Sequence, residues 1–103
     1  MPKMRLFIDT HDKRNKSFPG ELSRQQFVAF FAAYEEACQA EGVVLVRTHV
    51  GYGDGRAFCL TMAATAEAVR RAHERVGLPF DDIIEVESAG PADTFFQMAR
   101  QSA

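Results

Sequence analysis

The segment that constrains the fold most is residues 55–86, GRAFCLTMAATAEAVRRAHERVGLPFDDIIEV. An aromatic and β-branched run at residues 56–62 precedes a pattern of helical period, and residues 82–87 form a second extended run. His73 recurs at helical spacing from Val69, so the helix directs its imidazole towards the interior of a small domain. A polar ring in that position requires a bonding partner or a ligand.

The rest of the chain supplies the other elements of one layered domain. In chain order they are a strand at residues 4–10, a loop at 11–22, a helix from the capping box of Ser23 and Gln26 to Gly42, a hairpin of strands at 43–50 and 56–62, a helix from Thr65 to Gly77, and a strand at 82–87. The order βαββαβ predicts an α+β, ferredoxin-like sandwich: a four-stranded antiparallel sheet with two helices on one face. We expect residues 1–103 to form a single domain, with an irregular C-terminal tail from about residue 90.

Composition narrows the class of partner. A length of 103 residues, 47% of them hydrophobic, suits one globular core. A net charge of -2 with interspersed signs predicts no nucleic-acid partner. The chain contains no apolar run of spanning length, so we expect no membrane partner. Cys38 and Cys59 lie too far apart for a paired metal knuckle, and no signal peptide is visible, so the expected location is the cytoplasm with reduced thiols.

Alternation along the strands predicts which side chains share a face. If Leu6 and Ile8 face the helices together with Phe58, Leu60 and Met62, the uncovered face carries Asp9, His11, Arg47, His49, Cys59 and Glu85 beside Phe7 and Leu45. Such a face is either solvated, with incidental ion pairs, or covered by a second subunit in a homodimer. In the second case the tail aromatics Phe95 and Phe96 would complete the interface.

Several side chains are candidates for metal binding, and each has an ordinary structural alternative. His73 can be a core histidine bonded to Tyr34, or a ligand. Asp9 and His11 share one face, and a carboxylate with an imidazole suits nickel or zinc, although Asp-x-His also occurs on ordinary polar strands. Cys59 is either a thiolate ligand or small core filler. Glu85 is either a ligand, a partner that orients a histidine, or a solvated carboxylate.

The segments IDTH, GRAFCL, EAVRRAHERVGLP and IIEV together resemble a family of small, largely uncharacterised bacterial ferredoxin-like proteins in which nickel binding has been described. The resemblance covers roughly four fifths of the chain, all but the long loop and the tail. It implies a ferredoxin-like homodimer that binds a divalent metal. Carried over residue by residue, the polar positions of the family fall on His11, Cys59, His73 and Glu85. From the residues themselves we expect Asp9 and Tyr34 to support the site.

The leading hypothesis is therefore a cytoplasmic, homodimeric protein that binds a divalent metal ion, with nickel favoured through the resemblance. The alternative is a cofactor-independent enzyme of the dimeric α+β barrel type, in which His73 or His11 is a general base for a small organic substrate. A metal binder requires converging N and O ligands, whereas such an enzyme requires a closed apolar pocket beside one base. A purely structural module would leave the histidines unconnected.

Overall fold

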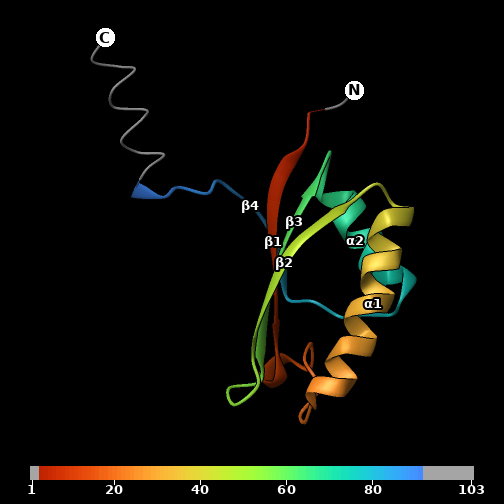
Figure 1. The fold of residues 1–103 in the computed structure, drawn as a ribbon, viewed down its shortest axis with the longest axis vertical. Coiled ribbons are helices and arrows are strands. Elements are labelled where there is room, and N and C mark those ends of the chain that lie inside the picture. The colour runs from red at the N-terminus through yellow and green to blue at the C-terminus, as the bar shows by residue number, and fades with distance from the viewer. Residues whose placement is uncertain (1–2, 92–103) are drawn as a thin grey trace.

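A computed structural model of the chain describes residues 3–91, in which two helices pack on one face of a four-stranded sheet (Figure 1). Its elements are β1 (Arg5–Asp12), the short 3-10 helix η1 (Lys13–Asn15), α1 (Arg24–Ala40), β2 (Val44–Gly51), β3 (Arg56–Ala63), α2 (Ala66–Arg75) and β4 (Asp82–Val86). The strands are antiparallel in the order β2-β3-β1-β4. The predicted α+β ferredoxin-like arrangement is confirmed.

The helix ends follow the sequence signals. Ser23 accepts from the amide of Gln26 while the Gln26 side chain accepts from the amide of Ser23, so the predicted capping box begins α1. Thr65 caps α2 in the same manner through the amide of Ala68. Gly77 follows α2 with a φ of 63°, a left-handed conformation that glycine adopts without strain.

The assignment of strand faces is wrong in the sequence analysis, and the two faces exchange roles. Alternate residues are buried on both strands, among them Phe7, Asp9 and His11 on β1 and Ala57, Cys59 and Thr61 on β3. These residues lie opposite one another in the β1/β3 register, on the side that the helices cover. Residue volume misleads on β3, because its larger apolar side chains, Phe58, Leu60 and Met62, alternate with the buried residues and point away from the helices.

The core accordingly includes two apolar residues that the sequence analysis places on the uncovered face. Phe7 is only 2% exposed and belongs to the main hydrophobic cluster, against which Leu45 packs. The other buried members of this cluster are Tyr34, Cys38, Val43, Ala63, Ala68, Val69 and Ala72. The predicted burial of Phe7 and Leu45 between subunits is therefore wrong, since the helices already cover them. Phe95 and Phe96 lie outside the described residues.

The opposite face of the sheet, which we call the open face, is covered by neither helix (Figure 1). Side chains in register across the strands form two rows there: Val44, Met62, Leu6 and Val86 in one, and Arg47, Leu60, Ile8 and Ile84 in the next. Ile84 is 49% exposed and Val44 53% exposed, so a contiguous apolar strip meets solvent in the single chain. Neither helix of residues 3–91 is long and apolar enough to cross a membrane.

The exchange of faces predicts a difference between two phenylalanine truncations. Phe7→Ala should lower the free energy of unfolding by about 3–5 kcal/mol, the usual cost of deleting a buried aromatic ring. Phe30→Ala is the matched control, because Phe30 is 54% exposed on α1 and should cost much less. Denaturant unfolding monitored by circular dichroism measures both. Equal losses would contradict the placement of Phe7 in the core.

Candidate metal centre

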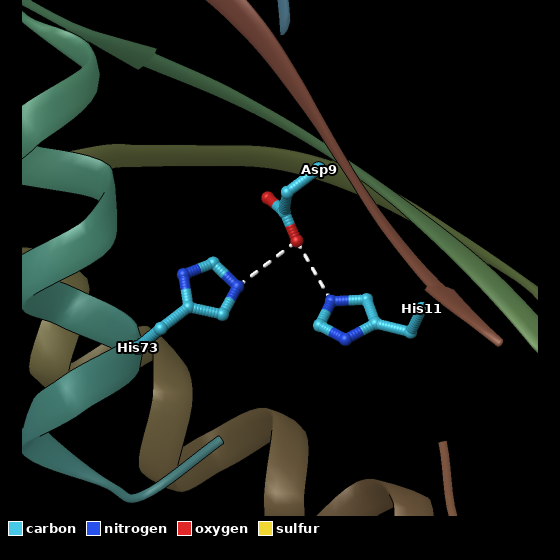
Figure 2. Close-up of side chains that lie close together, drawn as sticks. All are labelled: Asp9, His11 and His73. Atoms are coloured by element: carbon cyan, nitrogen blue, oxygen red, sulfur yellow. Dashed lines mark hydrogen bonds and ion pairs between the residues drawn. The ribbon is translucent and has the colours of Figure 1, made fainter. Parts of the chain in front are cut away.

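Three buried polar side chains from two elements converge beneath the helices (Figure 2). Asp9 and His11 project from β1, and His73 projects from α2. The Oδ2 atom of Asp9 lies 2.8 Å from Nε2 of His11 and 2.9 Å from Nε2 of His73. Asp9 and His73 are 0% exposed and His11 is 4% exposed, so water does not screen the cluster. With the strand faces corrected, Asp9 and His11 lie on the same side of the sheet as His73, so one site can include all three.

Backbone carbonyls fix the tautomer of both rings. His73 Nδ1 lies 2.8 Å from the carbonyl oxygen of Val69, one turn earlier in α2. His11 Nδ1 lies 2.7 Å from the carbonyl oxygen of Pro79 and 3.2 Å from that of Ser17. A carbonyl oxygen only accepts, so Nδ1 must carry the proton in both rings. A neutral ring then presents the lone pair of Nε2, and both lone pairs point at Asp9.

This geometry requires an additional positive charge. Two nitrogen lone pairs and an anionic oxygen at hydrogen-bonding distance repel one another unless a cation lies among them. Protons on the Nε2 atoms can supply that charge, in which case both histidines donate to Asp9. A metal ion can also supply it, with Asp9, His11 and His73 as ligands. The Nδ1–H groups, which donate to backbone carbonyls, are consistent with a metal ion, because metal-binding histidines usually donate their other ring N–H to a carbonyl or carboxylate.

The carboxylate is held in its ionised form. Burial by itself raises the pKa of Asp9, but the hydrogen bonds with His11 and His73 outweigh it, so the pKa lies below the ordinary value of 3.8. Burial lowers the pKa of His11, but the hydrogen bond with Asp9 and its negative charge outweigh burial, so the pKa lies above 6.5. In the absence of another cation, Asp9 therefore stays ionised and His11 holds a second ring proton more readily than an ordinary histidine.

The second carboxylate oxygen of Asp9 is also available to a ligand. Oδ1 is buried and has no hydrogen-bond partner among the described residues. A buried carboxylate oxygen without a partner is costly, and such an atom indicates a ligand, ion or water that belongs at the site. Two imidazole nitrogens and one carboxylate are a donor set that suits nickel or zinc. The residues present thus fit a borderline divalent ion.

The other predicted site residues lie around or away from this cluster. Cys59 is buried directly opposite Asp9, its Sγ accepts from Thr48, and burial together with the charge of Asp9 raises the pKa of its thiol. The thiol is thus held protonated, which disfavours it as a ligand. Glu85 is exposed and pairs with Arg5, so the structure places it apart from the three converging groups.

Tyr34, a predicted supporting residue, and His49, which was not predicted as a ligand, differ in their relation to His73. The hydroxyl oxygen of Tyr34 lies 3.3 Å from Nδ1 of His73, as expected for a supporting group on the neighbouring helix. His49 is exposed on β2, in register with Phe58 on the open face. It therefore lies outside the cluster and serves as an internal control.

Sequence reasoning gave Asp9 too small a role and missed the carbonyls of Ser17, Val69 and Pro79. Asp9 was expected to support a site, whereas both imidazoles contact it directly. One signal could have revealed this role: a histidine on the inner face of α2 requires a polar partner on the strand face below it. The carbonyl of Val69 is also foreseeable, since it lies four residues before His73 in a helix. The carbonyls of Ser17 and Pro79 come from loops that no local pattern places.

Comparison with known proteins now adds to the geometry. The family model described as nickel responsive protein SCO4226-like matches residues 7–86. That match spans more than half of the chain, so the protein belongs to this family, and the resemblance inferred from the sequence is confirmed. No protein with a curated description matches the chain.

Among solved structures, the chain is similar to the one described as crystal structure analysis of SCO4226 from Streptomyces coelicolor A3(2). The two share 27% sequence identity with a TM-score of 0.71. The match covers 82% of this chain and 99% of that chain. Asp9, His11 and His73 all fall within the residues that the family model matches.

The cluster predicts how stability without metal depends on pH. The raised pKa of His11 stabilises the fold below its unfolded value of 6.5, and this contribution is lost as the pH rises through the folded value. The lowered pKa of Asp9 stabilises the fold above 3.8 and is lost only as the pH falls through the folded value. In the presence of a chelator, the free energy of unfolding should therefore decline as the pH rises from about 6.5 through the raised pKa of His11.

The substitution Asp9→Asn should flatten this decline, because it removes the charge that raises the pKa of His11. Asp82→Asn is the matched control, since Asp82 is exposed on β4 and outside the cluster. Urea unfolding at a series of pH values provides the measurement. A slope that is the same in wild type and Asp9→Asn would contradict the assigned protonation states.

Proposed function

We propose that the protein is a divalent-metal-binding protein whose ligands are Asp9 Oδ2, His11 Nε2 and His73 Nε2. The observation that carries the proposal is the convergence of two Nε2 atoms on one carboxylate oxygen while both Nδ1 atoms are committed to backbone carbonyls. Donor atoms that bind one metal ion at about 2.0–2.2 Å must lie within about 4 Å of one another. The two N–O distances, 2.8 and 2.9 Å, satisfy that limit.

Nickel is the favoured ion. The matching family is described as nickel responsive, and nickel accepts imidazole nitrogen together with carboxylate oxygen. Zinc accepts the same donors, so both ions belong in the test. A bound ion would stabilise the fold by tying β1 to α2, because it binds the folded state and not the unfolded one.

The enzyme alternative has less support. A small apolar cavity does lie beside His11, as a general base would require. However, Nδ1 of His11 faces the carbonyls of Ser17 and Pro79, and Nε2 faces Asp9. Neither nitrogen is free to take a proton from a molecule in the cavity, and His73 is 0% exposed. The described geometry therefore favours ligand binding over base catalysis.

The proposal includes a homodimer formed through the open face. Its support is the apolar strip formed by the two rows, which are apolar on every strand except at Arg47 of β2 and have Leu6, Ile8 and Leu60 at their centre. Arg47 and His49 on β2 lie at one edge of this face and Asp82 on β4 at the other, so an apolar centre has a polar rim. Self-complementary interfaces commonly have this arrangement. A second copy would remove the strip from water without contacting the metal ligands.

Metal binding should depend on His11 and His73 and not on His49. Isothermal titration calorimetry with nickel and with zinc should show one site per chain, and His11→Ala or His73→Ala should weaken binding by about 10–100-fold or more. His49→Ala is the matched control and should bind like wild type. Unmeasurable affinity, or equal affinity in wild type and the His11→Ala, His73→Ala double variant, would remove the basis for the proposal.

The pH dependence of binding should oppose the pH dependence of stability without metal. Both imidazoles must be neutral to coordinate, so affinity should fall as the pH drops through the raised pKa of His11, which lies above 6.5. Binding near this pH should release protons, which titrations in two buffers of different ionisation enthalpy can count. Affinity that is constant across this range would contradict coordination by the two rings.

Dimerisation should respond to a charge on the open face and not to one elsewhere. Val44→Glu should shift the protein towards monomer, because Val44 is 53% exposed in the apolar rows. Val28→Glu is the matched control, since Val28 is 65% exposed on α1. Light scattering at micromolar concentration measures both. A monomeric wild type, or equal dissociation of the two variants, would refute the interface.

A further inference from the structure

A cavity of about 70 Å³ lies between α1, the loop after η1 and the β2/β3 hairpin. Aromatic and aliphatic side chains dominate its lining, chiefly Phe18, Leu22, Phe27, Phe31 and Leu78. Phe30 also lines it and is 54% exposed, so the cavity meets solvent along the N-terminal half of α1. This site is separate from the proposed metal centre, although the ring of His11 forms part of its wall.

The polar groups that line the cavity are already bonded within the protein. His11 uses Nδ1 on two carbonyls and Nε2 on Asp9. Ser17 Oγ donates to Asp81 and accepts from the amide of Asp12, and Thr48 Oγ1 donates to Cys59 Sγ. These groups leave little hydrogen-bonding capacity for a guest molecule, because their donors are engaged.

The apolar lining determines which kind of molecule the cavity can bind. A buried water needs two to four polar partners, whereas an apolar cavity stays dry and takes up apolar molecules. A charged molecule would lose its hydration without compensation. An engineered cavity of roughly 150 Å³ binds benzene, and this one is about half as large. A single ring can therefore enter by one edge while its other edge rests on the exposed Phe30.

We propose that this cavity is a binding site for a small uncharged aromatic molecule, held between Phe31 of α1 and Ala57 of β3. Edge and face contacts with the surrounding phenylalanine rings would stabilise a planar guest beyond its apolar area. The proposal does not depend on metal binding, because the nitrogens of His11 point to other protein groups. A metal-free protein should therefore bind the same molecule.

Toluene is the probe, and benzoate is its charged counterpart with the same ring. Nuclear magnetic resonance titration of the full chain with chelator present should show saturable shifts from toluene at Ala57, Leu78 and Phe31. Benzoate should bind at least about 10-fold more weakly, since its carboxylate loses part of its hydration beside an apolar lining that offers it no free donor. Equal affinity for benzoate, or toluene shifts that do not saturate or that lie on the open face at Ile8 and Leu60, would overturn the proposal.

Two variants test the location of the site. Ala57→Leu should reduce toluene affinity at least about 10-fold, because the larger side chain fills the cavity. Ala33→Leu is the matched control, on an exposed position of α1 outside the lining, and should bind like wild type. Phe31→Trp, which narrows the cavity from the helix side, provides the same test if Ala57→Leu does not fold. Unchanged toluene affinity in a folded cavity variant would refute this location.

Discussion

The contact on which the structure depends is the buried carboxylate of Asp9 between two imidazole nitrogens. A charge with no exposed surface is costly, so the fold tolerates it only because His11 and His73 supply compensating partners. The same contact joins β1 to α2 across the core. It also requires a cation, either protons or a metal ion, because the carbonyls of Val69 and Pro79 hold the ring protons on the opposite nitrogens.

The surrounding structure positions these rings with little freedom. The ring of His73 packs against those of Tyr34 and Phe80, with centroid separations of 4.7 and 4.9 Å, and stacks on His11 at 5.5 Å. The loop after β1 returns to His11 through the Ser17 carbonyl, and the segment between α2 and β4 does so through Pro79. Ser17 in turn is bonded to Asp12 and Asp81, which ties the two loops together. Preorganisation of this kind would lower the cost of binding an ion at the proposed site.

Much of the fold was predictable from local physical signals. The capping residues Ser23 and Thr65 and the glycines that end the helices determine where α1 and α2 lie, and the hairpin follows from Gly51 to Gly55 between two β-rich runs. The direction of His73 was predictable too, because helical period fixes it. These features depend on neighbours within a few residues, and the sequence displays such neighbours directly.

The faces of the sheet were not predictable in the same way. On β1 both alternating sets contain apolar residues. Leu6 and Ile8 form a more apolar set than Phe7, Asp9 and His11. Hydrophobicity therefore favours the set of Leu6 and Ile8 for the core. In the structure, side chains of the helices themselves fill the space between helices and sheet, which leaves room for small or polar strand residues such as Ala57 and Asp9. The apolar set instead faces outward, where an interface between subunits would explain it. The feature that distinguishes the two assignments of faces is the pairing of His73 with a strand carboxylate, which is a long-range contact.

Nitrogen-15 magnetic resonance of the imidazole rings tests the central claim most directly. In protein titrated with zinc, which is diamagnetic, the rings of His11 and His73 should keep the proton on Nδ1, and their Nε2 resonances should move to the positions of metal-bound nitrogen. His49 should not change. The account is contradicted if zinc leaves both Nε2 resonances unmoved, or if Nδ1 is the nitrogen that loses its proton.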